Sequence, residues 1–146
     1  MMRENALWAK KWNDQKMQDK IKSASGVVMA LDKTNNSPCG FGRIFIVSTT
    51  EEYEAKFAYL TDITIASEYQ NKGLGFALTN TLLGMFIDGN SKRCAHGSIC
   101  LFCSDEGVGA IAAPKLYRKS GFEFFDKTDK RMALIHTDQF HGHSSS

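Results

Sequence analysis

The fold of this chain is decided by one short stretch, Tyr69-Gln70-Asn71-Lys72-Gly73-Leu74-Gly75. Its two glycines let the backbone turn sharply and approach a ligand closely. A helix-like run follows, and the first amides of a helix have no intrahelical partner, so they point outward at the turn. Glycine turns also occur in plain strand-to-helix connections, so the flanking segments decide the interpretation. Together with those segments, the stretch predicts a cradle for a phosphate group.

The segments on either side fit a strand and a helix. Residues 57–65 are rich in β-branched and aromatic residues and alternate loosely from Leu60 onward, which is typical of a strand. After the turn, mostly apolar residues recur at helical spacing until the stop signal Gly89-Asn90. The recurring residues are Leu74, Ala77, Leu78, Thr81, Leu82, Met85 and Phe86. We therefore expect a helix over residues 73–86.

Two motifs carry a resemblance to a known family. Gln70-x-x-Gly73-x-Gly75 resembles the acetyl-coenzyme A signature of the GNAT acetyltransferase superfamily, Arg/Gln-x-x-Gly-x-Gly/Ala. Further along, the run 116–122, with Tyr117 as its second residue, looks like that superfamily's Leu-Tyr-x-x-x-Gly-Phe element. Two motifs in the expected order are far harder to produce by chance than either one alone. The resemblance covers roughly residues 6–136 and implies the GNAT fold.

The order of the predicted elements agrees with this resemblance. They are helical residues 5–24 with a break at Asn13-Asp14, strands 26–31, 40–47 and 57–65, helix 73–86, strand 97–102, helix 111–120, and strands 122–125 and 131–135. The fold class is α/β (α+β), with a central mixed, mostly antiparallel sheet that the resemblance implies is splayed at the cofactor site. Because only residues 1–4 precede the first helix, we expect the superfamily's first strand to be absent.

Length and composition bound the class of protein. A chain of 146 residues, 42% hydrophobic and 23% charged, fits one globular domain, which we place at residues 1–136, before a polar, disordered tail at 137–146. The net charge of +2 is too small to predict nucleic-acid binding. The sequence has neither a leader nor an apolar run of the roughly 18 to 20 residues that a membrane span needs. We expect no membrane partner and a cytoplasmic location.

The cysteines predict no metal centre. Cys39, Cys94, Cys100 and Cys103 occur in a chain that is able to build its own core, which favours reduced thiols over disulfides. Cys100-x-x-Cys103 has the spacing of metal ligands, but it lies along a predicted strand. Positions three apart on a strand face opposite sides of the sheet. We therefore expect structural thiols and no metal cofactor.

The resemblance assigns the contacts to acetyl-coenzyme A, the implied co-substrate. In the superfamily, the strand before the cradle separates from its neighbour, and its free backbone groups hold the pantetheine arm and the thioester carbonyl. The matching positions are Ile63, Thr64 and Ile65. Amides aimed at that carbonyl would stabilise a developing oxyanion, commonly by ~3 kcal/mol per donor. The residues expected to hold the pyrophosphate are Gln70, Asn71, Lys72, Gly73, Leu74 and Gly75.

Two side chains are candidates for the chemistry. A phenol has an ordinary pKa near ~10, so Tyr117 would hold a proton to give to a departing thiolate, as a general acid. The alternative is that Tyr117 packs against the sheet with its hydroxyl bound to the backbone. Asp62, a carboxylate in an apolar strand, is the candidate base, although it would equally serve as a counter-charge for an amine or cap a turn. Glu68, Glu106 and His96 are further options.

The resulting hypothesis is an N-acetyltransferase that transfers acetyl directly from acetyl-coenzyme A to a primary amine on a small molecule or a protein. The alternative is a non-catalytic acyl-coenzyme A-binding or interaction module. It is favoured by Ala110, which stands where the superfamily often carries an asparagine that contacts the pantetheine arm. A dinucleotide-binding fragment is disfavoured, because the third glycine of that motif is missing. We also expect a homodimer, since a sheet edge without its first strand tends to recruit another chain.

Overall fold

The computed structural model describes residues 13–48, 56–88, 97–103, 109–124 and 132–136. Several predictions concern residues outside these ranges: the tail at 137–146, the candidate bases His96 and Glu106, and the start of the N-terminal helix together with any strand before it. The described elements are α2 (Asp14–Lys22), β1 (Gly26–Leu31), β2 (Pro38–Ser48), β3 (Lys56–Ile65), η2 (Ser67–Tyr69), α3 (Leu74–Asp88), β4 (Gly97–Phe102), α4 (Gly109–Lys119), β5 (Glu123–Phe124) and β6 (Met132–His136).

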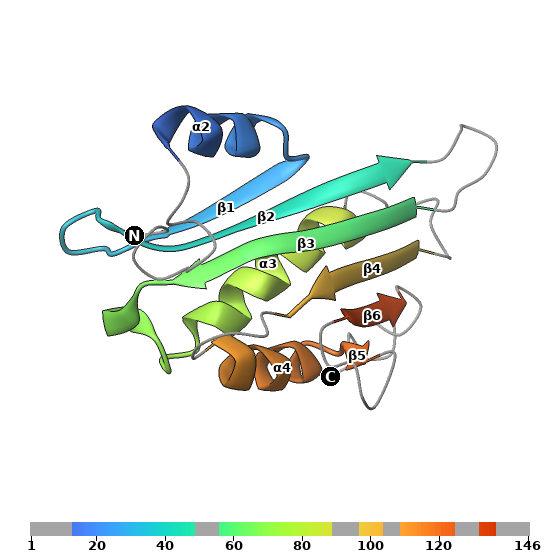
Figure 1. The fold of residues 1–146 in the computed structure, drawn as a ribbon. Coiled ribbons are helices and arrows are strands. Elements are labelled where there is room, and N and C mark those ends of the chain that lie inside the picture. Colours follow the sequence, from blue (N-terminus) through green and yellow to red (C-terminus); the bar gives the residue numbers. More distant parts are fainter. Residues whose placement is uncertain (1–12, 49–55, 89–96, 104–108, 125–131, 137–146) are drawn as a thin grey trace.

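The described strands form one six-stranded mixed sheet in the order β1-β2-β3-β4-β6-β5 (Figure 1). All neighbouring strands are antiparallel except β3 and β4, which run parallel. A parallel pair needs a long crossover connection, and α3 provides it. The predicted fold class is therefore confirmed, and β1 forms one edge of the sheet within the described part of the chain.

The second part of the predicted N-terminal helical segment begins at the predicted position, Asn13-Asp14, and the part before it lies outside the described residues. Asn13 has an extended backbone, and its side chain accepts a hydrogen bond from the amide of Lys16 at 2.8 Å, so it is the N-cap of α2. Asp14 in the first turn and Lys20 and Lys22 in the last turn have the charges that the helix dipole favours. Within the described ranges, the helices are too short or too polar to cross a membrane.

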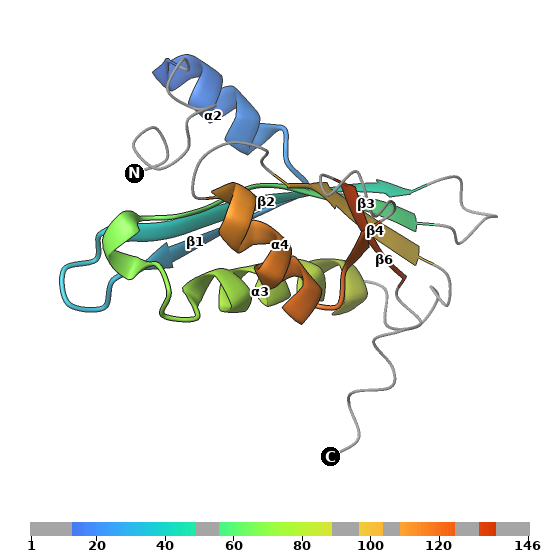
Figure 2. The same cartoon turned by 60° about the horizontal axis from the view of Figure 1, so that its bottom comes forward.

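The sheet separates two layers of helix, with α2 on one side and α3 on the other (Figure 2). The α3 side holds the main core, to which strand and helix residues contribute Ile44, Ala58, Leu60, Ile99, Leu101, Leu78, Leu82, Leu83 and Phe86. Complete burial of one side chain of this size stabilises the folded state by roughly 1.5–3 kcal/mol. A Cβ on Gly42 would lie 2.7 Å from methyl carbons of both Leu78 and Leu82. Only glycine therefore lets β2 approach α3 this closely.

Candidate active site

The sheet opens between β3 and β4. The two strands are paired from Lys56 opposite Gly97 to Leu60 opposite Leu101, and β3 then continues to Ile65 without β4 beside it. The last part of β3 keeps its partners on β2, whereas no described strand pairs with its other edge. The splay that the family resemblance implies is therefore present, and it leaves backbone groups of β3 available to a ligand.

A β-bulge lies where β3 leaves β4. The register between β2 and β3 shifts between Phe41 and Arg43, so that Gly42 faces both Asp62 and Ile63. Asp62 has a φ of 60°, a left-handed conformation that aspartate tolerates better than most residues. A bulge bends its strand and increases the local twist. The extra residue in β3 thus accounts for its divergence from β4.

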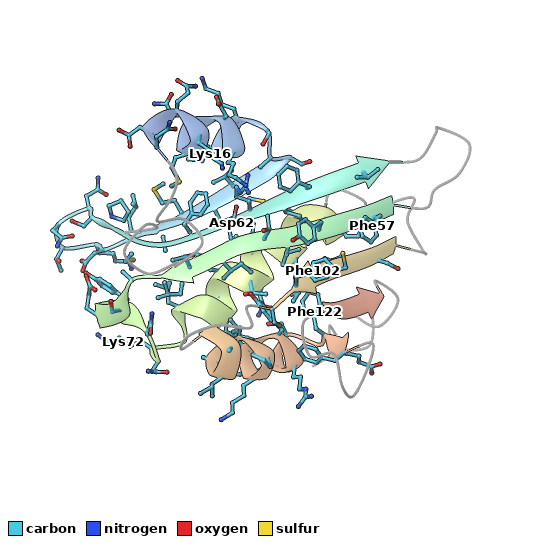
Figure 3. All side chains as sticks on the ribbon, viewed as in Figure 1. Lys16, Phe57, Asp62, Lys72, Phe102 and Phe122 are labelled. Carbon is cyan, nitrogen blue, oxygen red and sulfur yellow. The ribbon has the colours of Figure 1, made fainter. Side chains whose placement is uncertain are left out.

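The bulge presents Asp62 to a buried arginine. The Arg43 guanidinium forms an ion pair with the Asp62 carboxylate, and the two side chains are only 4% and 8% exposed. Arg43 also donates to the carbonyl of Lys20 in the last turn of α2, and its guanidinium carbon lies 5.1 Å from the centre of the Phe45 ring. Figure 3 labels Asp62 at this position on β3, near α2. Arg43 therefore links the bulge to α2, a role that the sequence analysis missed.

The candidate residues of β3 lie on opposite sides of the sheet. Asp62 pairs with Arg43 on the α2 side, whereas Ile63 and Ile65 lie beside the glycines of β2 that face α3. Asp62 therefore faces away from these two isoleucines, as the alternation of side chains along a strand leads one to expect. The hydroxyl of Thr61 lies 3.3 Å from the Asp62 carboxylate, and it is the other described group that donates to it.

The cradle has the geometry of an anion site. Asn71 and Gly73 have φ values of 59° and 81°, and the first amide-to-carbonyl bond of α3 runs from Ala77 to Gly73 at 3.1 Å. Among the described residues, no acceptor is bound by the backbone amides of residues 71–76. Successive free amides in a turn at a helix N-terminus attract anions. A Cβ on Gly73 would meet no atom within 4 Å, so the space beside it is open.

Side chains hold the cradle in place. The Gln70 side-chain amide donates to the carbonyl of Ile65 at 3.0 Å, which ties the turn to the end of β3. Tyr69 donates its hydroxyl to the Asp32 carboxylate in the β1–β2 loop. Lys72 lies on the turn, exposed, with its ammonium 5.6 Å from the centre of the Tyr69 ring (Figure 3). The side chain of Gln70 therefore positions the backbone, while Lys72 has its charge available near the free amides.

The carboxylate of Asp32 is the acceptor that organises the β1–β2 loop. The hydroxyl and the amide of Thr34 donate to it at 2.6 and 2.7 Å. These bonds, first that of the Thr34 hydroxyl and then that of Tyr69, lower the pKa of Asp32 from 3.8 to about 2. The same contact with Asp32 raises the pKa of Tyr69 to about 12. The loop and the cradle are thus joined by one charged hydrogen bond.

The second motif forms the end of α4. Gly121 has a φ of 96°, its amide donates to Arg118, and the amide of Phe122 donates to the carbonyl of Tyr117. This pair of bonds is a Schellman motif, which commonly brings the residue after the glycine onto the last turn of the helix. The rings of Tyr117 and Phe122 indeed lie 5.9 Å apart, edge to face. The predicted end of this helix, at residue 120, agrees with the observed end at Lys119 to within one residue.

Tyr117 lies in the core with its hydroxyl uncharged. Burial raises the pKa of its phenol, and the nearby Cys103 and Tyr59 raise it further. Within the described part of the chain, no residue forms a hydrogen bond with the Tyr117 hydroxyl. Burial also raises the pKa of the Cys103 thiol, to about 11. Both groups therefore keep their protons at neutral pH.

Helix α4 packs directly against the cradle. A Cβ on Gly75 would lie 3.2 Å from a methyl carbon of Leu116, so the second glycine of the cradle lets α4 come close. The Lys119 ammonium lies 4.6 Å from the centre of the Phe76 ring. The helix carrying Tyr117 is therefore fixed against the turn that carries the free amides.

The candidate residues fall into two groups. The end of β3, the cradle and α4 are in contact with one another on one side of the opening. Asp62 lies on the α2 side and forms no hydrogen bond with Tyr117. Glu68 lies exposed in η2. The structure thus brings the predicted cofactor residues together and separates the predicted base from the predicted acid.

Comparisons with known proteins agree with this architecture. A family model described as the Acetyltransferase (GNAT) family matches residues 2–122. No curated protein sequence matches the chain. Among solved structures, an acetyltransferase of Trypanosoma brucei is 20% identical with a TM-score of 0.56, over 78% of this chain and 73% of that one.

Two further solved structures contain coenzyme A or a derivative. Naa50 of Arabidopsis thaliana, in complex with the bisubstrate analogue CoA-Ac-MVNAL, is 22% identical with a TM-score of 0.58, over 86% of this chain and 80% of that one. YhbS of Escherichia coli, a GNAT family N-acetyltransferase in complex with CoA, is 12% identical with a TM-score of 0.60, over 99% of this chain and 79% of that one. These likenesses concern the fold, and together with the match of the family model they show that the chain belongs to the GNAT acetyltransferase family.

Proposed function

We propose that this protein is an N-acetyltransferase that transfers acetyl from acetyl-coenzyme A directly to a primary amine. The observation that carries the proposal is the junction of two features, the free amides of residues 71–76 and the unpaired edge of β3. Gln70 joins them through its bond to Ile65. One bound molecule that carries phosphates at one end and an amide-containing arm at the other would use both features.

The cradle and the strand would divide the binding of acetyl-coenzyme A. The free amides of the cradle and the charge of Lys72 suit a pyrophosphate, and the dipole of α3 adds to the attraction. The open space beside Gly73 leaves room for it. Backbone groups of Ile63, Thr64 and Ile65 would then bind the arm and the thioester carbonyl. An amide aimed at that carbonyl would stabilise the oxyanion that forms when an amine attacks.

Tyr117 is proposed as the general acid. When the amine nitrogen bonds to the acetyl carbon and the carbon–sulfur bond breaks, the departing thiolate needs a proton. The Tyr117 phenol retains its proton at neutral pH, because burial raises its pKa. Its hydroxyl forms no hydrogen bond with any described residue, so it would be free to donate to the sulfur atom.

Direct transfer is favoured over an acyl-enzyme intermediate. Cys103 is the thiol that interacts with Tyr117, and burial raises its pKa to about 11, so it is a poor nucleophile at neutral pH. The Arabidopsis structure holds a bisubstrate analogue, as suits an enzyme that binds both substrates at once. We assign the same order of events to this protein.

Asp62 is proposed as the acceptor of the amine's proton, either directly or through a water. It borders the opening of the sheet, and its ion pair with Arg43 fixes the carboxylate in one position. The amine would approach from the α2 side, while the thioester would be bound along β3. Placing acid and base on different sides of the sheet suits a reaction in which the two substrates enter from different sides.

The alternative, a binding module without turnover, rests on Ala110, which cannot supply the asparagine contact to the pantetheine arm. A thiol-release assay with acetyl-coenzyme A and a panel of primary amines separates the two. The proposal expects amine-dependent release well above the rate without amine. Acetyl-coenzyme A that binds in calorimetry, but releases no thiol with any amine, would establish the binding module instead.

A further inference from the structure

One side of the sheet carries a group of large, mainly exposed apolar side chains, which we call the aromatic face. It consists of Val47 on β2, Phe57 on β3 and Phe102 on β4, together with the half-buried Tyr59 on β3. Val47, Phe57 and Phe102 are 53%, 43% and 55% exposed. The rings of Tyr59 and Phe102 lie 6.0 Å apart, edge to face. Soluble proteins seldom expose contiguous apolar groups without a binding role.

The register places the aromatic face on the α2 side of the sheet. Val47 is opposite Phe57, while the residues that alternate with them on β2, β3 and β4 are buried in the core against α3. Helix α2 lies over the β1 end of the sheet, away from β4 (Figures 1 and 2). Figure 3 shows Phe57 and Phe102 on the strands left uncovered.

The aromatic face borders the opening of the sheet. Leu101 is the last residue of β4 that pairs with β3, and Phe102 is the next residue. On β3, Tyr59 precedes Leu60, after which the strand leaves β4. The exposed rings therefore begin where the reacting thioester would lie, on the side that Asp62 occupies.

The strands themselves carry no net charge on this side of the sheet. Along the described parts of β2, β3 and β4, the α2 side carries one cation, Arg43, and one anion, Asp62, and they are paired with each other. A phosphorylated amino sugar would meet no uncompensated cation from these strands. A polyamine would meet a single carboxylate from these strands, Asp62, for its several ammonium groups. An amine attached to an apolar body suits both the rings and the neutral surface.

We propose that the aromatic face binds the apolar body of the acceptor, so that the substrate class is a monoamine on an aliphatic or aromatic group. This inference rests on the proposed N-acetyltransferase function. Exposed apolar area on the acceptor would be buried against Phe57 and Phe102, each added methylene contributing up to ~0.8 kcal/mol, which is about a fourfold gain in affinity. The free amine would extend past Phe102 toward the opening.

The test compares acceptors and variants in one thiol-release assay. Wild-type protein is given butylamine, hexylamine, octylamine, ethanolamine, spermidine and glucosamine 6-phosphate at saturating acetyl-coenzyme A. We expect kcat/KM to rise about two- to fourfold per methylene along the alkyl series and to exceed that of the polar amines at least about tenfold. Phe102→Ser should lower kcat/KM for hexylamine about tenfold, change that for ethanolamine less than about twofold, and leave the KM of acetyl-coenzyme A unchanged.

Met29→Ser is the matched control, because Met29 is also large, apolar and 49% exposed but lies on the edge strand β1, far along the sheet from Phe102. This variant should leave kcat/KM unchanged for every acceptor. If kcat/KM does not rise along the alkyl series, the inference is overturned while the proposed function stands. The same holds if Phe102→Ser lowers kcat/KM equally for hexylamine and ethanolamine. A wild-type dimer that Phe102→Ser converts to a monomer in sedimentation would also overturn it, since the face would then bind a second copy.

Calorimetry of hexylamine with the protein–coenzyme A complex distinguishes the two proposals. If no amine supports turnover, yet hexylamine binds and Phe102→Ser weakens it about tenfold, the apolar site stands and the enzymatic function falls. If no amine supports turnover and hexylamine does not bind, both are wrong. If hexylamine neither binds nor reacts while a polar amine is acetylated, only the apolar site is wrong.

Discussion

Arg43 and Asp62 form a buried ion pair across the bulge between β2 and β3, and the same arginine binds the last turn of α2 through Lys20. One side chain thus fixes the position of a candidate catalytic carboxylate and the placement of a helix. A buried ion pair adds little net stability compared with apolar residues, but removing one partner leaves an uncompensated charge. This asymmetry gives the first prediction.

Arg43→Met should lower the free energy of unfolding by about 3–5 kcal/mol, because the Asp62 carboxylate stays buried without its counter-charge. Urea unfolding measures the loss. The double variant Arg43→Met/Asp62→Asn should recover most of it, since asparagine tolerates the φ of 60° at this position and carries no charge. Equal losses in the single and double variants would show that the arginine acts through its contact with α2 and not through Asp62.

Gly73→Asp should abolish binding of coenzyme A, because a carboxylate would enter the open space where the pyrophosphate is expected. Gly73→Asn is the matched control. It has the same shape and suits the φ of 81°, but it is neutral, so it should weaken binding far less. Calorimetry with coenzyme A measures both variants, with circular dichroism to check the fold. Equal affinities of the two variants would refute the assignment of the anion site.

Tyr117→Phe should lower kcat about 10²-fold with little change in the affinity for acetyl-coenzyme A, because only the proton donor is removed. Burial raises the pKa of this tyrosine, so the wild-type rate should not fall on the alkaline side until the pH exceeds about 10, the ordinary value for tyrosine. The variant should lack that alkaline limb. A variant with the wild-type kcat and limb would reduce Tyr117 to a packing residue.

Tyr69→Phe should make folding less sensitive to acid and to alkali. The pKa of Asp32 is lowered from 3.8 to about 2, so its contribution to stability is complete above about pH 4 and is lost as the pH falls through about 2. The pKa of Tyr69 is raised from 10.0 to about 12, so its contribution is complete below pH 10 and is lost as the pH rises through about 12.

Unfolding curves of wild type and Tyr69→Phe across both pH ranges check this prediction. The variant should lose the whole alkaline effect but only part of the acid effect, because Thr34 is the larger cause of the Asp32 shift. Thr34→Val should remove most of the remainder. If both variants keep the full acid sensitivity of the wild type, the hydrogen bonds to Asp32 do not contribute to the stability of the fold in solution.

Most of the fold was predictable because the local signals agree with the tertiary structure. Alternating apolar residues placed β3, helical spacing placed α3, and Gly121 marked the end of α4, all within a few residues of their observed bounds. The Asn13 cap lies at the break that the sequence predicts within residues 5–24. In each case a short segment carries the whole signal, so no long-range contact was needed.

The relationships between distant segments were not predictable. In the sequence, Arg43 is only a charge within an apolar strand. Its pairing with Asp62 depends on a bulge that shifts the register by one residue. A signal existed, because a cation and an anion each interrupt a neighbouring apolar strand. The amide of Gln70 was assigned to the pyrophosphate, yet it donates to the carbonyl of Ser67, and the side chain donates to that of Ile65. A motif identifies a residue without showing how its backbone and side chain are oriented.

The Schellman motif at the end of α4 gives the residues of one sequence motif two different roles. Gly121 and Phe122 serve the helix: they close its last turn and hold the Tyr117 ring by contact. The phenolic oxygen alone remains for chemistry. A chain of this fold would therefore keep the glycine and both rings to stay folded even if it had lost all turnover. Recognition of the motif therefore reports on architecture, and in the proposed mechanism only the phenolic oxygen takes part in the chemistry.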